Sequence, residues 1–381
     1  MVKKKICFVI ASRANYGRIK PVLFELKKKI NLQIILTASS LLDRFGNLTE
    51  ILIKDGFKIN KKCHVMIEGG DNLGMAKSTG LSILDLSNAF DELKPDVVVT
   101  VGDRFETLAT AISASYMNIT LAHIQGGEVT GSIDESVRHA ITKLSHIHFA
   151  ATDRSKKYII KMGEDPKFVF NTGCPSIDIV KNNKKKLKDI KSLMNGVGQK
   201  FNFDKPYLTV IFHPVTTEFD VIKNQINILA DAINEINLQV IWFWPNIDAG
   251  TDIISKVLRT FREKNKLKNV TFYKNFDVED YIVILKNTKC AVGNSSSFIR
   301  EGSYLGTPSI IVGKRQNKRE IGHNVIFSNF NKKNIIKKIN NFIKGKKKIT
   351  RNTIYGNGNA SKKIAKLILN KKPSIQKTLK Y

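Results

Sequence analysis

The sequence lacks the features that mark disulfide-rich, metal-binding, membrane and secreted proteins. Its 381 residues include only four cysteines, Cys7, Cys63, Cys174 and Cys290, and no C-x-x-C pair. This spacing fits neither a zinc site nor a disulfide framework, so we expect buried structural thiols at Cys7 and Cys290, which lie in apolar runs. No apolar run reaches membrane-spanning length. The apolar patch near the N-terminus, about six residues, is too short for a signal peptide. We therefore expect a cytoplasmic protein without a membrane partner.

Acidic residues are scarce as well. Against 63 Lys and Arg the chain has 33 Asp and Glu, a net charge of +30. This balance raises the possibility of a nucleic-acid partner. However, the excess is mostly lysine, in runs such as NNKKKLKDIK, and neither zinc-finger spacing nor an RNP-type aromatic motif accompanies it. We therefore favour solvated lysines, which can steer a polyanionic small substrate, and expect no nucleic-acid partner.

The chain alternates short β-branched runs with helix-like stretches. KKICFVIA, LQIILTAS and PDVVVTVG are near-continuous apolar runs, which are typical of parallel strands buried on both faces. The length suits two domains rather than one core. We predict an α/β protein of two Rossmann-like, doubly wound domains with an inter-domain cleft. The expected limits are an N-terminal domain at 1–180, a linker at 181–205, a C-terminal nucleotide-binding domain at 206–360, and a helix and tail at 361–381 that can cross back.

Polar motifs follow many of the predicted strands. Ligands of doubly wound domains bind beyond the carboxyl ends of the strands, so these motifs are the candidates for a site. In the first half they are SRANYG, GDRFE and GGE; in the second half they are HPVTTE, PNIDAG and GNSSS. Such a concentration of polar residues at strand ends exceeds what a stable sheet requires, and it predicts an enzyme.

Carboxylates and histidines are the candidate acid/base groups. Asp103 and Glu128 each follow a strand, and the Gly126–Gly127 pair would let backbone and ligand approach closely. Two carboxylates near a sugar ring can stabilise positive charge and move protons. Asp103 could instead cap the next helix, and His213 could be a capping histidine rather than an acid/base group. The motif HEXXH is absent, and His139, His146 and His148 do not share one helix face, so these histidines lack the spacing of a helical metal site.

The stretch GNSSSFIRE predicts a phosphate site. An apolar strand runs into Ser295 and Ser296, and a helix follows, so backbone N–H groups and two hydroxyls would face an anion. Arg315 could supply a guanidinium to a diphosphate. An ordinary serine N-cap is the competing interpretation. Because neither G-x-G-x-x-G nor G-x-x-x-x-G-K-[ST] occurs, dinucleotide and P-loop sites are disfavoured.

These motifs, in this order, resemble the hydrolysing UDP-N-acetylglucosamine 2-epimerases that supply sialic acid synthesis, and their relatives in the legionaminic acid pathway. The resemblance runs from about residue 4 to about residue 360 and rests on SRANYGRIKP, GDRFE, GGEVTGSIDESVRHAITKLSHIH, GCPS, FHPVTTE, PNIDAG, VGNSSSFIRE and GKRQNKRE. It implies a GT-B-like fold. It also implies elimination of UDP to a 2-acetamidoglucal, followed by addition of water to give N-acetylmannosamine, without a metal or other cofactor and in a homodimer or homotetramer.

The resemblance carries over to individual positions. It implies acid/base roles for Asp103, Glu128, Asp134 and His213, without deciding which of them removes the proton from C2. The positions that match nucleotide or sugar binding are Arg13, Arg104, Asn246, Asp248, Ser295, Ser296, Glu301 and Arg315, with Glu301 expected on the ribose.

The chain also departs from the family pattern. Gln125 stands where a glutamate commonly precedes Gly-Gly, and Asn15 replaces the usual aspartate of the first motif. These changes leave the sugar open between N-acetylglucosamine and a 2,4-diacetamido-trideoxy sugar. The sequence also leaves the nucleotide open between UDP and GDP. A non-hydrolysing epimerase, a GT-B glycosyltransferase and a binding protein that has lost catalysis are the competing interpretations.

Overall fold

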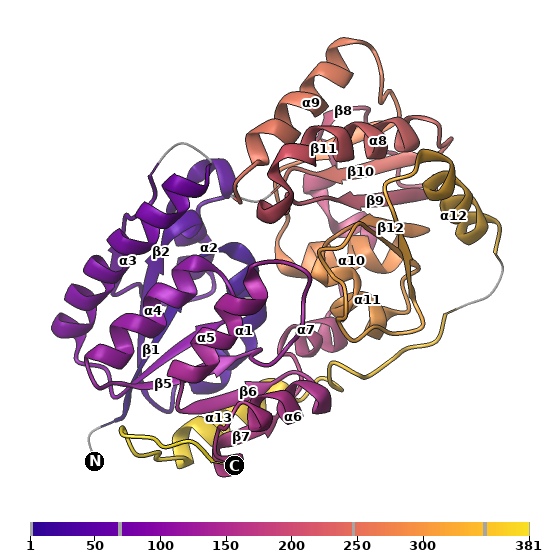
Figure 1. Ribbon diagram of the computed structural model, residues 1–381. Helices are drawn as coiled ribbons and strands as arrows, with labels where there is room; N and C mark the ends of the chain where they lie inside the picture. Colours follow the sequence, from indigo (N-terminus) through magenta and orange to yellow (C-terminus); the bar gives the residue numbers. More distant parts are fainter. Residues whose placement is uncertain (1–2, 68–70, 246–247, 346–348, 381) are drawn as a thin grey trace. The chain divides into compact units, whose positions relative to one another are not determined.

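The chain folds into two compact units, in a computed structural model that describes residues 3–67, 71–245, 248–345 and 349–380. The first unit comprises Met1–Val129, Ile133–Lys181 and Tyr355–Tyr381, and the second comprises Thr130–Ser132 and Asn182–Ile354. In Figure 1 the indigo-to-magenta segments and the yellow C-terminal helix form the first unit. Each unit contains one seven-stranded sheet with helices, which confirms the predicted α/β class.

The sheet of the first unit has the strand order β3-β2-β1-β4-β5-β6-β7. All of its pairings are parallel. Its strands are β1 (Lys5–Ile10), β2 (Asn31–Thr37), β3 (Lys61–Cys63), β4 (Val97–Val101), β5 (Thr120–Ile124), β6 (Ile147–Ala150) and β7 (Val169–Asn171).

Helices cover both faces of this sheet because successive residues of β1 point to opposite sides. Ile6, Phe8 and Ile10 pack with α1 (Arg13–Leu26), α2 (Leu48–Lys54) and α13 (Ala360–Asn370). Cys7 and Val9 pack with α3 (Asn72–Leu93), α4 (Phe105–Tyr116) and α5 (Asp134–Leu144). The remaining helices of the unit are α6 (Asp153–Lys161), α7 (Ser176–Asn182) and the 3₁₀ turns η1 (Ala38–Leu41), η2 (Asp43–Phe45) and η3 (Pro166–Phe168).

The sheet of the second unit has the order β14-β13-β12-β9-β10-β11-β8, with β8 as its antiparallel strand. Its strands are β8 (Val197–Gly198), β9 (Tyr207–Ile211), β10 (Gln239–Phe243), β11 (Val270–Tyr273), β12 (Cys290–Gly293), β13 (Ser309–Val312) and β14 (Val325–Ser328). Its helices are α8 (Ile222–Asn234), α9 (Thr251–Glu263), α10 (Val278–Asn287), α11 (Arg300–Leu305), α12 (Lys332–Lys344) and the 3₁₀ turns η4 (Leu187–Asp189), η5 (Lys191–Asn195), η6 (Thr216–Val221) and η7 (Ser296–Phe298).

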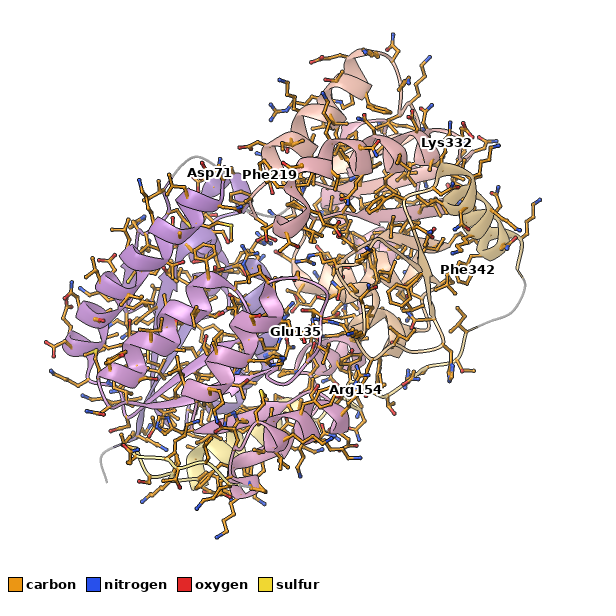
Figure 2. All side chains as sticks on the ribbon, in the orientation of Figure 1. Asp71, Glu135, Arg154, Phe219, Lys332 and Phe342 are labelled. Atoms are coloured by element: carbon orange, nitrogen blue, oxygen red, sulfur yellow. The ribbon has the colours of Figure 1, made fainter. Side chains whose placement is uncertain are left out.

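Apolar side chains of α8, α9 and α12 form the main core of this unit together with the sheet. Leu208 and Val210 of β9 and Trp242 of β10 lie at its centre, each fully buried. Burying such side chains contributes about 1.5–3 kcal/mol each to folding. Figure 2 shows the side chains of both units, with Phe342 on α12 among those labelled.

Residues 182–205 differ from the predicted linker, because they are built into the second unit. β8 pairs with β11, and Ile190 and Leu193 are buried between the lysines of this segment. The Tyr273 hydroxyl donates to the Leu193 carbonyl at 2.6 Å. The prediction followed the charge and the Gly and Asn content of the stretch. It overlooked a few apolar residues that are sufficient to pack the stretch against the second unit.

The C-terminal segment belongs to the first unit from Tyr355 onward, and α13 packs beside α1. The buried carboxylate of Asp178 accepts from the backbone N–H groups of Ala360 at 3.0 Å and Ser361 at 2.7 Å. A carboxylate at a helix N-terminus satisfies free N–H groups and opposes the helix dipole. Asp178 therefore holds the start of α13 in this unit.

The buried cysteines agree with the sequence analysis. Cys7 lies in β1 and Cys290 in β12, both fully buried and free, and burial raises the pKa of each thiol. Among the described residues, no helix combines the length and apolar character needed to span a bilayer.

Candidate active site

Each sheet reverses its strand order at one point, and that is where doubly wound folds bind ligands. In the first unit the reversal lies between β1 and β4, and in the second between β9 and β12. Arg13 begins the helix after β1, and Asp103 and Arg104 follow β4. The motifs after β9 and β12 contain His213, Ser295 and Ser296. Several of the predicted site residues therefore flank the two reversal points.

A buried asparagine bridges the diverging strands at both points. Asn15 accepts from Ala11 N at 3.2 Å and donates to Val101 O at 3.4 Å. Asn294 accepts from the backbone N of His213 and donates to its carbonyl, both at 2.8 Å. An amide side chain can do this because it has both a donor and an acceptor, and it replaces ladder bonds lost where strands separate. Asn294 thus fixes the backbone of His213, and the sequence analysis did not single it out.

The turns that carry Asp103 and Glu128 share one partner, Arg138 of α5. Its side chain is buried; Nη2 forms an ion pair with the Asp103 carboxylate, and Nη1 donates to the Glu128 carbonyl at 2.6 Å. Charge-assisted bonds of this kind are strong and directional. The sequence analysis missed Arg138. Its position four residues after Asp134, on the same face of the helix, was the available signal.

Glu128 itself is 4% exposed and follows the Gly126–Gly127 pair. A Cβ at Gly127, whose φ is +72°, would lie 2.3 Å from the Ser155 carbonyl oxygen. A Cβ at Gly126 would lie 2.8 Å from the Thr142 hydroxyl. In the described contacts the two glycines therefore make room for α5 and α6.

The other predicted residues of the first unit occupy helix starts. Arg104 immediately precedes α4, and its Nε lies 3.0 Å from the carboxylate of buried Glu106. Asp134 is the first residue of α5, and Arg13 is the first of α1, where Ser12 accepts from Asn15 N. A carboxylate in the first turn of a helix is favoured by the helix dipole.

In the second unit, Arg315 and the serines gather around Asn294. Arg315 Nη1 donates to the Asn294 carbonyl at 3.4 Å, and Nη2 lies 3.8 Å from the Asp248 carboxylate. Ser295 caps η7, with its hydroxyl 2.8 Å from that of Ser297. Ser296 accepts from Arg300 at 3.0 Å. The arrangement places a guanidinium and hydroxyl groups at the strand end, a combination suited to a diphosphate.

Glu301 and Asn246 complete the predicted set. Glu301 lies in α11, and its buried Oε2 has no hydrogen-bond partner among the described residues. A carboxylate oxygen of this kind can accept from a ligand hydroxyl. Asn246 lies outside the described residues.

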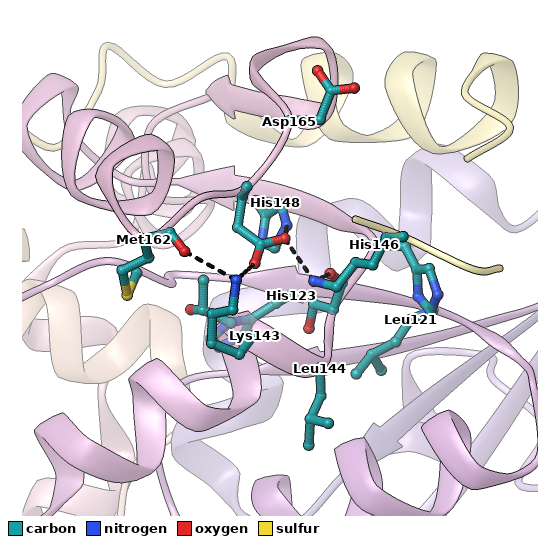
Figure 3. A network of polar contacts seen from close by, with 12 residues as sticks. Leu121, His123, Lys143, Leu144, His146, His148, Met162 and Asp165 are labelled. Carbon is teal, nitrogen blue, oxygen red and sulfur yellow. Dashed lines mark hydrogen bonds and ion pairs between the residues drawn. The ribbon is translucent and has the colours of Figure 1, made fainter. Parts of the chain in front are cut away.

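The histidine-rich run after β5 separates into different environments, and one of them is a partly buried polar network (Figure 3). In this network Glu164 accepts from Lys143 Nζ at 2.6 Å, from Lys377 Nζ at 2.6 Å and from His148 Nε2 at 3.2 Å. His148 lies in β6, and His146 precedes that strand. The described residues contain no group of three or more His, Cys, Asp or Glu that could hold a metal ion.

Residues Thr130–Ser132, between Glu128 and Asp134, belong to the second unit although the residues on either side belong to the first. They pack with the second unit, where Gly131 N donates to the Arg315 carbonyl at 3.2 Å. A Cβ at Gly131 would lie 2.0 Å from the Lys314 carbonyl oxygen, so only glycine fits this contact.

Comparison with known proteins places the chain in a family. The family model described as UDP-N-acetylglucosamine 2-epimerase matches residues 24–369. The chain therefore belongs to the UDP-N-acetylglucosamine 2-epimerase family, and it is a UDP-sugar 2-epimerase.

Two relatives are similar over most of their length. The UDP-N,N'-diacetylbacillosamine 2-epimerase (hydrolyzing) of Legionella pneumophila is 35% identical over 367 residues, which cover 96% of this chain and 95% of that protein. The GDP/UDP-N,N'-diacetylbacillosamine 2-epimerase (hydrolyzing) of Campylobacter jejuni is 35% identical over 336 residues, covering 87% of this chain and 86% of that protein.

A solved structure supports the fold. The crystal structure of UDP-GlcNAc 2-epimerase from Neisseria meningitidis bound to UDP-GlcNAc matches with a TM-score of 0.78 at 21% identity, covering 96% of this chain and 100% of that one. The two-domain, GT-B-like fold expected from the sequence is thereby confirmed.

Proposed function

We propose that this protein is a hydrolysing 2-epimerase that converts UDP-N,N'-diacetylbacillosamine and water into UDP and the 2-epimeric free sugar, for nonulosonic acid synthesis. The observation that carries the reaction class is the buried Arg138, which joins the carboxylate of Asp103 to the turn of Glu128. Arg138 thereby holds the turns of Asp103 and Glu128 at one edge of the sheet, where both carboxylates could exchange protons with a bound sugar.

The chemistry explains the need for several acid/base groups. Hydrogen at C2 of a 2-acetamido sugar is not acidic, so a base removes it while the C1–O bond to the diphosphate breaks and C1 gains positive character. The products of this elimination are a 2-acetamidoglucal, UDP and a proton on the base. Water then adds across the double bond: its oxygen bonds to C1 as it gives up a proton to a base, and an acid delivers a proton to C2 on the face opposite to the one that lost it, which gives the 2-epimer. Overall one water is consumed.

We assign these proton transfers to Asp103, Glu128, Asp134 and His213. Carboxylates can stabilise the developing charge at C1, and a fixed histidine can donate or accept a proton near neutral pH. The double hydrogen bond from Asn294 supports the assignment of His213, because a catalytic side chain needs a backbone that does not move.

Binding of the donor is assigned to the remaining predicted residues. Arg315, Ser295 and Ser296 would hold the diphosphate, and the unpartnered Glu301 oxygen would accept from a ribose hydroxyl. The donor contacts of the other positions are proposed from the motif resemblance alone: Arg13, Arg104, Asn246 and Asp248.

The choice of donor rests on the relatives. Both 35% identical proteins act, by their names, on diacetylbacillosamine donors, and one of the two names includes GDP as well as UDP. UDP-N-acetylglucosamine, giving N-acetylmannosamine, is the second candidate, because the matching family model takes its name from that donor. We also propose a cytoplasmic homodimer or homotetramer, which sedimentation velocity would test.

The test is proton NMR of the purified protein in D2O with each donor in a separate tube. We expect the diacetamido donor to give free UDP and a free sugar with deuterium at C2, faster than UDP-N-acetylglucosamine gives its products. A product that keeps its nucleotide would indicate the non-hydrolysing reaction. The GDP-linked donor in a third tube measures the nucleotide preference.

A matched variant separates catalysis from binding. Glu128→Gln keeps the size of the side chain but removes its charge, so we expect turnover to fall by about 10²-fold or more while UDP affinity by calorimetry stays within about twofold. Glu135→Gln, seven residues later at the partly exposed start of α5, is the control and should keep wild-type turnover. If Glu128→Gln turned over at the wild-type rate, the assignment of Glu128 would be wrong.

A further inference from the structure

We propose that His123, which no sequence motif assigned to the site, is the positioning residue that holds the turns of Asp103 and Glu128 in register. The inference rests on the proposed function. His123 is fully buried in β5, five residues before Glu128, and its Nε2 lies 2.8 Å from the Gly102 carbonyl. Gly102 is the residue directly before Asp103.

The bond from His123 means that both the N–H and the carbonyl of Gly102 are hydrogen-bonded. Gly102 N donates to the Ile124 carbonyl at 3.0 Å, while its own carbonyl accepts from His123. Both backbone polar groups of Gly102 are therefore held by β5. Gly102 has a φ of +88°, a conformation that turns the chain sharply out of β4, so these two hydrogen bonds set the direction in which Asp103 leaves the strand.

The other edge of the imidazole supports the second turn. Nδ1 lies 3.3 Å from the Thr142 hydroxyl of α5, which itself lies 3.0 Å from the Arg138 carbonyl. A Cβ added at Gly126 would lie 2.9 Å from His123 Nδ1. The glycine turn that leads into Glu128 thus rests directly on the ring. One imidazole contacts the turn of Asp103, the turn that leads to Glu128 and the helix of Arg138.

The protonation state of His123 is determined by its partners. A carbonyl can only accept, so Nε2 carries the hydrogen and Nδ1 of the neutral ring carries none. Burial lowers the pKa of His123 to about 3, although the bond to Gly102 opposes this shift. The charged or titratable groups that act on the ring are His148, Glu128 and His139. His123 is therefore a neutral donor at working pH and does not exchange protons with substrate.

The experiment compares two amides that differ only in reach. His123→Gln can extend an N–H toward the Gly102 carbonyl, whereas His123→Asn, one methylene shorter, cannot. We expect kcat, measured with the donor that the wild type turns over, to fall by about 10–100-fold in His123→Asn. Displacing a catalytic carboxylate by about 1 Å has effects of that size. His123→Gln should recover most of this loss. KM should stay within about twofold in both variants, since the proposed nucleotide contacts are elsewhere.

His148→Asn is the matched control. His148 faces His123 across the β5–β6 pairing and is 1% exposed, but its Nε2 contacts Glu164 and neither turn. The kinetic constants are normalised to the folded fraction from urea unfolding. A role in stability alone predicts equal losses of kcat in the two Asn variants, or equal values for His123→Gln and His123→Asn, and either outcome would overturn the proposal.

A second measurement does not depend on turnover. Long-range ¹H–¹⁵N NMR of the wild-type protein should show His123 as the neutral Nε2–H tautomer, unchanged between about pH 5 and pH 8. A ring that titrates in this range, or carries its hydrogen on Nδ1, contradicts the geometry on which the inference depends. If the wild type turned over no donor while this signal was present, the proposed function would be wrong, but the hydrogen bond from His123 to Gly102 would be confirmed.

Discussion

The buried carboxylate of Glu164 should make a large, pH-dependent contribution to stability. Burial alone would raise its pKa, but hydrogen bonds from His148, Lys143 and Lys377 outweigh burial and lower the pKa from 4.5 to about 2. A difference of about 2.5 pKa units corresponds to about 3.4 kcal/mol of stability. Because the side chains of Lys143 and Lys377 are 39% and 31% exposed, solvent screening reduces this figure, and we expect about 2–3 kcal/mol.

The sign of the effect follows from the lowered pKa. A carboxyl group with a folded pKa below its unfolded value stabilises the protein fully above about pH 4.5, and this stabilisation is lost as the pH falls toward about 2. Glu164→Gln should therefore be about 2–3 kcal/mol less stable than the wild type at pH 7. The difference should shrink to roughly half by pH 3, because the carboxyl group of the unfolded chain is then mostly protonated while that of the folded protein is still mostly ionised.

Urea unfolding followed by circular dichroism at pH 7, 5, 4 and 3 measures both variants. Asp165→Asn is the control, since Asp165 caps η3 through Lys167 N and an asparagine can make the same bond, so its cost should stay below about 0.5 kcal/mol. Figure 3 shows the Asp165 carboxylate directed away from the network. Equal stability of Glu164→Gln and the wild type at pH 7, or a gap that does not shrink with falling pH, would refute the reasoning.

Three further predictions concern the strand ends. Arg138→Met leaves a buried carbonyl and a carboxylate without their partner, so we expect about 3–5 kcal/mol of lost stability in urea unfolding, and wild-type stability would contradict the ion pair. Gly127→Ala should cost at least about 2 kcal/mol by the same assay, because the added Cβ meets the Ser155 carbonyl at a positive φ. Asn294→Leu removes both bonds to the His213 backbone; we expect about 1–3 kcal/mol of lost stability and a clear loss of kcat, and an unchanged kcat would remove Asn294 from the site.

Sequence reasoning succeeded where a local pattern has one structural meaning. The run PDVVVTVG predicted a strand buried on both faces, and β4 is fully buried along its length. The same alternation predicted Cys7 and Cys290 as buried thiols. It also placed Asp103 and Glu128 at the carboxyl ends of β4 and β5, because polar residues directly after such strands lie at one edge of the sheet.

It failed where a residue's role depends on a partner distant in sequence. The lysine-rich stretch 181–205 was predicted to be a linker, yet β8 pairs with β11 more than 70 residues later. Gly126 and Gly127 were expected to let backbone and ligand approach closely, but their packing role was not predicted: a Cβ at Gly126 would meet α5 and one at Gly127 would meet α6. The composition of a segment indicates how much apolar surface that segment can bury by itself. It does not predict whether the segment packs against another element distant in the sequence.

The sequence by itself determined the α/β class, the family and the positions of the acid/base candidates, because hydrophobic periodicity and strand-end motifs are local properties. Only the tertiary structure decided how those candidates are held. Arg138 joins Asp103 to Glu128, and His123 contacts Gly102. Asn294, directly after β12, binds the backbone of His213, which lies 81 residues earlier. These contacts connect turns that become neighbours only after the parallel strands have paired. Folding of the chain, rather than spacing in the sequence, brings the turns within hydrogen-bond distance.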